Sequence, residues 1–285
     1  MQASGYMKVV KKKEEVRDAL EDISRIGFVP TMGALHEGHI SLIDASRKLK
    51  LYTICSIFIN PTQFNNATDL DAYPIDIEGD LKLLEAAGCD LVFIPNKDEV
   101  YTQSIEDPKY LHDFGALETN IEGAFRPGHF KGVGQVVHIL FEIVQPHSAF
   151  FGEKDFQQLQ VIRKLVDMCN LDIDIVGLPT VRESDGLAMS SRNRRLTPLQ
   201  RSHANLLYEA LKYAADELGQ SSVEDINEHV EDMFKNDPEL RLEYFEIIHA
   251  SNFERMHQFE GQKEVRGVIS AYAGEVRLID NKQLA

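Results

Sequence analysis

Thr31-Met-Gly-Ala-Leu-His-Glu-Gly-His39 follows an apolar run, Ile26-Gly-Phe-Val29, and Pro30. An amphipathic segment, residues 40–49, comes directly after it. An apolar run, a glycine-containing turn and an amphipathic segment in this order predict a buried strand, a tight loop and a helix that begins near Leu35.

The two histidines of this stretch suit an anion. His36 and His39 are three positions apart, so they share one face of the predicted helix. Gly38 between them lacks a Cβ that would block a ligand. A helix N-terminus offers free N–H groups and a partial positive charge, to which the imidazoles add donors, and the combination suits a triphosphate. Two alternatives stay open: zinc ligation, although no further ligand stands at a standard spacing, and ordinary first-turn histidines.

Length and composition set limits on the class of protein. The chain has 285 residues, 43% of them hydrophobic and 27% charged, which is typical of a globular enzyme with one large domain or two modest ones. The formal net charge of −16 argues against nucleic acid as a partner, because phosphate backbones are bound through an excess of Lys and Arg. A small anionic substrate needs only a local positive pocket.

The sequence also bears on location. No apolar stretch approaches the length of a membrane span, and the N-terminus lacks an apolar signal core, so we expect no membrane partner. The three cysteines, Cys55, Cys89 and Cys169, are odd in number and far apart. They predict reduced thiols in the core of a cytoplasmic protein.

Strand-like and helix-like segments alternate between residues 26 and 181. Near-continuous apolar strands joined by helices predict a parallel sheet that helices cover on both faces, hence an α/β fold. Besides the first strand, the expected strands are 52–59, 90–94, 149–151 and 173–178, and the expected helices are 76–87, 133–144 and 156–170.

The character of the chain changes after Pro179. A polar, charged segment, 182–195, precedes a long amphipathic helix that starts at Pro198. A second helix over 222–234 leads to strands at 242–249, 268–273 and 276–279. These features predict a smaller α+β domain.

Polar segments stand where the first-domain strands end, which is where parallel sheets bind ligands. Asn60-Pro-Thr-Gln-Phe64 follows the second strand, and Gln63 can both donate to and accept from a substrate. Gly152-Glu-Lys-Asp155 follows the fourth, where Gly152 permits close approach and Lys154 adds a charge. A turn with a polar tip and a helix N-cap at Asp155 are the alternatives.

Two further loops carry basic and hydroxyl groups. Residues 122–133 hold Arg126, His129 and Lys131 among three glycines, a pattern that fits an anion site or a solvated loop. Residues 187–193 hold two hydroxyls and Arg192, which could close over a triphosphate, or could form a linker.

Taken together, these segments resemble the pantoate–β-alanine ligase family of the nucleotidylyltransferase superfamily. The resemblance runs from about Phe28 to Asn193 and resumes at 277–282. His36 and His39 match the His-x-Gly-His signature of the superfamily, and 189–192 match its second, Lys-Met-Ser-Lys-Ser-like signature.

The resemblance implies a Rossmann-like, nucleotide- and pantoate-binding domain over residues 1–181 and a smaller α+β lid domain over 182–285. It implies a cytoplasmic homodimer that uses magnesium-ATP, and it implies two steps. Pantoate attacks the α-phosphorus of ATP to give pantoyl adenylate and pyrophosphate. The amine of β-alanine then attacks the acyl carbon to give pantothenate and AMP.

The resemblance also assigns site residues. Gly79 interrupts the consecutive acidic residues that some relatives carry near the metal, so Asp80 is doubtful as a metal ligand and none is assigned. The catalytic residues implied are His39, His36 and Lys154. The ATP-binding residues implied are Met32, Gly33, Ala34, Leu35, His36, Glu37, Gly38, His39, Gly152, Glu153, Lys154, Asp155, Val181, Met189, Ser190, Ser191 and Arg192. The substrate-binding residues implied are Gln63, Gln158, Tyr73 and Arg126.

Three rival functions share part of this pattern. A nucleotidylyltransferase with another substrate would keep both signatures, and the pair Gln63 and Gln158 favours the ligase. An aminoacyl-tRNA synthetase would also keep both, but the net charge of −16 disfavours tRNA. A regulatory nucleotide-sensing module would keep the phosphate contacts without a pocket for the acid.

Overall fold

The computed structural model describes residues 7–65, 67–101 and 107–285, which form two compact units. The first unit comprises the described residues up to Glu118, with Glu122–Glu153 and Gln157–Pro179. The second comprises Thr119–Ile121, Lys154–Phe156 and Thr180–Ala285.

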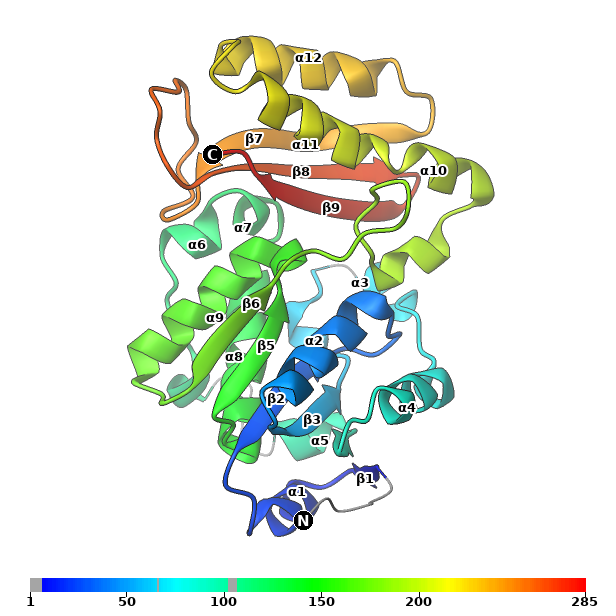
Figure 1. The fold of residues 1–285 in the computed structure, drawn as a ribbon, viewed down its shortest axis with the longest axis vertical. Helices are drawn as coiled ribbons and strands as arrows, with labels where there is room; N and C mark the ends of the chain where they lie inside the picture. The colour runs from blue at the N-terminus through cyan, green and yellow to red at the C-terminus, as the bar shows by residue number, and fades with distance from the viewer. Residues whose placement is uncertain (1–6, 66, 102–106) are drawn as a thin grey trace. The chain divides into compact units, whose positions relative to one another are not determined.

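A six-stranded sheet organises the first unit (Figure 1), and every neighbouring pair of its strands is parallel. The predicted Rossmann-like α/β fold is therefore confirmed. The strands in sheet order are β1 (Lys8–Val10), β4 (Leu91–Phe93), β3 (Tyr52–Ile57), β2 (Ile26–Thr31), β5 (Ser148–Gly152) and β6 (Asp174–Leu178).

Helices cover both faces of this sheet because its central strands are apolar on both sides. Phe28 and Ile54 pack into one core cluster with residues of α8 and α9. Their neighbours Val29 and Cys55 pack into a second cluster with residues of α2 and α4. The longer helices are α1 (Lys13–Leu20), α2 (Glu37–Lys48), α4 (Ile77–Ala86), α8 (His129–Val144) and α9 (Phe156–Cys169).

The strand order reverses at β2. The chain moves outward from β2 through β3 to β4, and β5 and β6 then extend the sheet on the other side of β2. Ligands of open α/β sheets bind outside the carboxyl ends of the strands at such a reversal. The loops that follow β2 and β5 therefore start at the expected binding edge.

Several short elements were not predicted. β1 and α1 were not predicted from the sequence. The three residues of β1 give too little periodicity to detect. The predicted basic loop over 122–133 is wrong: α7 (Glu122–Phe125) occupies its start, and α8 begins at His129. The remaining short elements of the region are α3 (Ala67–Asp71), α5 (Lys97–Val100), α6 (Ala116–Thr119) and the 3-10 turns η1 (Pro61–Gln63), η2 (Pro108–Tyr110) and η3 (Glu153–Asp155).

The second unit has the predicted α+β character. Its antiparallel sheet has the order β7-β8-β9, and α11 and α12 supply the apolar residues that cover it. Its elements are η4 (Ser191–Arg195), α10 (Pro198–His203), α11 (Leu206–Glu217), α12 (Val223–Lys235), β7 (Leu240–His249), β8 (Val265–Ala273) and β9 (Val276–Gln283).

The prediction of a single long helix from Pro198 is wrong, because the helix is interrupted between α10 and α11. Asn205 is the N-cap residue of α11, and its side-chain Nδ2 donates to Glu209 Oε1 at 2.8 Å. The Asn205 side chain makes no capping hydrogen bond to the backbone of α11.

The cysteines follow the prediction only in part. All three are unpaired, and Cys55 and Cys89 are buried, whereas Cys169 is half-buried at the end of α9. The prediction of a core position for Cys169 is therefore wrong. In the described part of the chain, none of the helices has the length and apolarity to cross a membrane.

Candidate active site

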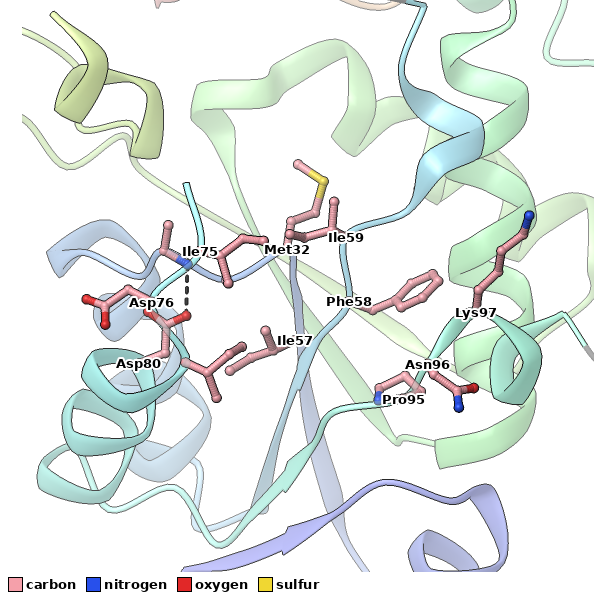
Figure 2. A pocket seen from close by; sticks show the side chains of 13 residues that line it. Met32, Ile57, Phe58, Ile59, Ile75, Asp76, Asp80, Pro95, Asn96 and Lys97 are labelled. Atoms are coloured by element: carbon pink, nitrogen blue, oxygen red, sulfur yellow. Dashed lines mark hydrogen bonds between the residues drawn. The ribbon is translucent and has the colours of Figure 1, made fainter. Parts of the chain in front are cut away.

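The loop after β2 is held in an uncommon backbone shape. Gly33 and Ala34 both have positive φ, 82° and 51°. Asp80 of α4, labelled in Figure 2, accepts hydrogen bonds from Ala34 N at 2.8 Å and Leu35 N at 2.6 Å. A Cβ on Gly33 would lie 3.0 Å from Asp80 Oδ2, so glycine is required there. The carboxylate thus fixes the loop that precedes α2.

This contact gives Asp80 a structural role that the sequence analysis did not assign. Asp80 is fully buried, and its carboxylate already serves two backbone N–H groups. A carboxylate that already accepts two backbone hydrogen bonds has less capacity left for a magnesium ion. Sequence could not reveal the role, because Asp80 and the loop are far apart in the chain.

The two imidazoles lie side by side, with ring centroids 4.1 Å apart. His36 is the N-cap of α2, which begins at Glu37 and not at Leu35. His36 Nδ1 accepts from Gly38 N at 3.2 Å, and His39 Nδ1 accepts from His36 N at 3.3 Å. A neutral imidazole that accepts at Nδ1 carries its proton on Nε2. Both rings therefore carry an Nε2–H donor that suits an anion.

Gln63 ends the short turn η1 after β3. Its side-chain Oε1 accepts from Asn60 Nδ2 at 3.2 Å, and its Nε2 donates to Met32 Sδ at 3.0 Å. A thioether is a weak acceptor, so Nε2 can bond instead to a better one, such as a carboxylate. The structure thus brings together Gln63 and Met32, which follow neighbouring strands.

A buried network that the sequence analysis missed holds Gln63 in place. Asn60 is 1% exposed, donates to Gly132 O at 3.1 Å and accepts from the Tyr101 hydroxyl at 2.6 Å. Burial raises the pKa of Tyr101 to about 12, so this hydroxyl keeps its proton and remains a donor at neutral pH. The sequence shows Asn60 as a polar residue at the end of a strand, where it can cap a turn, whereas no local sequence pattern points to Tyr101.

Arg126 and His129 hold the backbone of the same turn. Arg126 Nη2 and His129 Nδ1 both donate to the carbonyl oxygen of Gln63, at 3.2 and 2.8 Å. Arg126 Nη1 lies 3.1 Å from His129 Nε2 and 3.4 Å from Glu122 Oε1. These contacts place Arg126 next to Gln63 and make it a support for the turn.

The two glutamines at the start of α9 differ in environment. Gln157 is buried, donates from Nε2 to Leu117 O at 2.9 Å and accepts from Glu122 N at 3.2 Å. Gln158 is half-buried.

Tyr73 is 7% exposed, and its ring packs edge-on against Phe64, with centroids 5.7 Å apart.

A pocket of about 270 Å³ adjoins the loop after β2 (Figure 2). Its walls are mainly apolar, so it can take the aliphatic part of a small ligand. The residues that line it are Met32, Gly33, Ala34, Ile57, Phe58, Ile59, Ile75, Asp76, Ile77, Asp80, Pro95, Asn96 and Lys97.

Lys154 and Asp155 group with the second unit. Asn281 Nδ2 donates to Lys154 O at 2.8 Å, and the Arg266 guanidinium stacks 3.8 Å from the centroid of the Phe156 ring. Lys154 Nζ lies 3.6 Å from Asp155 Oδ1. The backbone of Lys154 is thus anchored, while its ammonium lies beside a carboxylate.

The segment from Val181 to Arg192, also in the second unit, folds back on itself. Met189 N donates to Val181 O at 3.0 Å, and Ser190 caps η4 by accepting from Arg192 N at 3.3 Å. A partly buried ion pair anchors its start, because Arg182 donates to both carboxylate oxygens of Asp280 at 2.6 and 3.0 Å. Burial raises the pKa of Asp280, and the adjacent guanidinium opposes that shift.

A Rossmann-like sheet with a His-x-Gly-His loop at its switch point defines a member of the nucleotidylyltransferase superfamily. The sequence model of the family "Pantoate-beta-alanine ligase" matches residues 8–283. The chain belongs to the pantoate–β-alanine ligase family.

Named relatives agree over nearly the whole chain. A pantothenate synthetase of Christiangramia forsetii is 46% identical over 280 residues, covering 96% of this chain and 98% of the relative. A solved pantothenate synthetase of Thermus thermophilus has a TM-score of 0.92 at 41% identity, covering 98% of this chain and 99% of that one. A pantoate–β-alanine ligase of Francisella tularensis, solved with β-γ ATP and β-alanine, has a TM-score of 0.82 at 32% identity and covers 98% of each chain.

Proposed function

We propose that the chain joins pantoate to β-alanine in an ATP-dependent reaction that forms pantothenate, AMP and pyrophosphate through a bound pantoyl adenylate. The observation that supports this most is the pair of Nε2–H donors on His36 and His39 after β2, together with the anchored Gln63 after the neighbouring strand β3. Two anions must meet for adenylation, and this edge of the sheet offers donors for both.

In the first step, a pantoate carboxylate oxygen bonds to the α-phosphorus of ATP while the bond to the bridging oxygen breaks. The pyrophosphate takes that electron pair and leaves. The protein supplies no covalent nucleophile, because the substrate carboxylate is one. We assign His39, His36 and Lys154 to the negative charge that grows on the phosphate oxygens, where fixed donors lower the barrier most.

Gln63 and Gln158 hold pantoate in this proposal. Gln63 offers an amide Nε2 whose acceptor here is the Met32 sulfur, and Asn60, Arg126 and His129 fix its turn. Tyr73 and Arg126 complete the substrate set, Arg126 through its contact with Gln63 O. The neutral amine of β-alanine then attacks the acyl carbon, the acyl–phosphate bond breaks and AMP leaves.

The ATP assignments follow the same family resemblance. Residues 32–39 bind the nucleotide through the loop that Asp80 fixes. Magnesium enters as part of the substrate, on the ATP phosphates, and the buried Asp80 is not a ligand for it. In the rest of the ATP set we place Gly152, Glu153, Lys154, Asp155, Val181, Met189, Ser190, Ser191 and Arg192.

Two assignments concern the whole protein. We place the enzyme in the cytoplasm, where its three unpaired cysteines are in keeping with a reducing compartment. We also propose that it is a homodimer and that residues 182–285 act as a lid domain, as the family resemblance implies. Light scattering on the purified chain tests the dimer.

The first test is product identity. With ATP, magnesium, pantoate and β-alanine, we expect one AMP and one pyrophosphate per pantothenate, measured by anion-exchange chromatography. The reason is that the site has a His-x-Gly-His loop and the sequence has no Gly-x-x-x-x-Gly-Lys-Ser/Thr loop. ADP as the stoichiometric product would contradict the proposal, and AMP formed without pantoate would favour another nucleotidylyltransferase.

A second prediction concerns Gly132, which brings α8 close to η1. A Cβ on Gly132 would lie 2.5 Å from Thr62 O, so Gly132→Ala must push the turn that carries Gln63. We expect kcat/KM for pantoate to fall roughly 10-fold, since small misplacements of a binding group are costly. The KM for ATP should change little. Lys131→Ala, on the exposed side of the same helix, is the matched control, and equal effects of both variants would rule out this role.

A further inference from the structure

A cluster of potential metal ligands lies away from the site described above. His112 follows η2, His138 is on α8 and Cys169 ends α9. One ring nitrogen of each histidine and the Cys169 sulfur all lie within 4.8 Å of one another. Because α9 starts after β5 and ends before β6, Cys169 lies toward the amino ends of the strands, opposite the edge that carries His36.

The ligand atoms have the chemistry of a zinc site. Imidazole nitrogens and a thiolate are the donors that tetrahedral Zn²⁺ prefers. With standard Zn–N and Zn–S bonds, neighbouring ligand atoms in a tetrahedron are about 3.3–3.7 Å apart. His112 Nε2 and His138 Nδ1 are 3.0 Å apart, so modest side-chain rotations suffice to bring all three onto one ion.

A carboxylate of α8 lies near the His138 ring. Glu142 Oε1 lies 3.9 Å from His138 Nε2. Tyr110 donates to Glu142 Oε2 at 2.6 Å, which fixes the carboxylate next to the ring. At 3.9 Å this carboxylate makes no hydrogen bond to the ring, and its Oε1 also lies 2.6 Å from Lys109 Nζ.

We propose that His112, His138 and Cys169 bind one Zn²⁺ ion, with water as the fourth ligand. On binding, the Cys169 S–H bond breaks, the proton passes to solvent and a Zn–S bond forms, with no change in oxidation state. The ion would tie the loop before α6 to α8 and α9. The proposed ion lies away from His36 and His39, so its binding can be tested without the ligase reaction.

The test uses Co²⁺ as a spectroscopic substitute for zinc in the metal-free full-length protein, without nucleotide. We expect about one equivalent of Co²⁺ to produce the visible bands of a tetrahedral site and a thiolate-to-cobalt charge-transfer band. One equivalent of Zn²⁺ should remove both. Cobalt bound at His36 and His39 would lack the thiolate band, so the two sites are distinguishable.

Variants make the test specific. Cys169→Ser should abolish the thiolate band and weaken zinc binding by roughly 100-fold or more, since loss of a ligand costs at least as much as loss of an outer partner. His112→Gln should also remove the tetrahedral bands, and it serves as a second variant if Cys169→Ser folds poorly. His257→Gln, at an exposed position, is the matched control and should bind as the unchanged protein does.

Thermal unfolding gives an independent readout. Zn²⁺ should raise the Tm of the unchanged protein and of His257→Gln, because an ion that binds only the folded state stabilises it. It should leave the Tm of Cys169→Ser unchanged. Absence of the thiolate band in the folded, unchanged protein would overturn the proposal. Persistence of that band in Cys169→Ser would overturn it as well, because another cysteine would then be the ligand.

Discussion

His39→Ala and Lys154→Ala should each lower the rate of adenylation by roughly 100-fold or more. Under the roles proposed for them, each change removes a donor to the charge that develops on the phosphates, which is worth about 3 kcal/mol in the transition state. His39 would lose its Nε2–H, and Lys154 would lose an ammonium whose side chain is 17% exposed. The measurement is the single-turnover rate of pyrophosphate release with ATP and pantoate.

Stability must be followed alongside the rate. His39→Ala also removes the hydrogen bond from His36 N, a loss of about 1 kcal/mol that should lower the Tm slightly without unfolding the protein. His257→Ala and Lys212→Ala, at exposed positions of the second unit, are the matched controls and should keep the normal rate. A folded His39→Ala or Lys154→Ala variant with near-normal turnover would show that its assigned role is wrong.

Enzyme supplied with ATP, magnesium and pantoate alone should release a burst of about one equivalent of pyrophosphate per active site and then stall. If Gln63 and Gln158 hold the pantoate carboxylate in line with the α-phosphorus, adenylation needs no β-alanine. A site that excludes water protects the acyl adenylate from hydrolysis. Rapid-quench assay of pyrophosphate, with ATP and pantoate in excess over the enzyme, measures the burst.

Addition of β-alanine should discharge the adenylate to pantothenate, and the discharge should be faster at higher pH. Only the neutral amine attacks, and a free alkyl amine is mostly protonated at pH 7. Gln158→Ala should shrink the burst because it loosens pantoate, whereas Lys131→Ala should leave it intact. A competent enzyme that shows no burst without β-alanine would point to a concerted or differently ordered mechanism.

Local sequence patterns were sufficient for the elements that repeat over many residues. Apolar runs such as 26–29 and 149–151 predicted parallel strands, because a strand buried on both faces must be apolar throughout. The stretch from Thr31 to His39 predicted the loop and helix at the binding edge. The break at Asn205 escaped detection, because the apolar spacing of α10 and α11 runs on through it.

The sequence by itself determined the α/β fold with its smaller α+β part, the family and the imidazole pair, because each is encoded by neighbours in the chain. Only the tertiary structure decided how the site is supported. Asp80 reaches Ala34 and Leu35 across 45 residues or more, and His129 reaches the carbonyl of Gln63 across 66. Such contacts depend on which strands and helices become neighbours, and side-chain hydrogen bonds between distant segments leave no periodic signal in the sequence. The same holds for His112, His138 and Cys169, which come together only because the sheet places α8 and the end of α9 on one face.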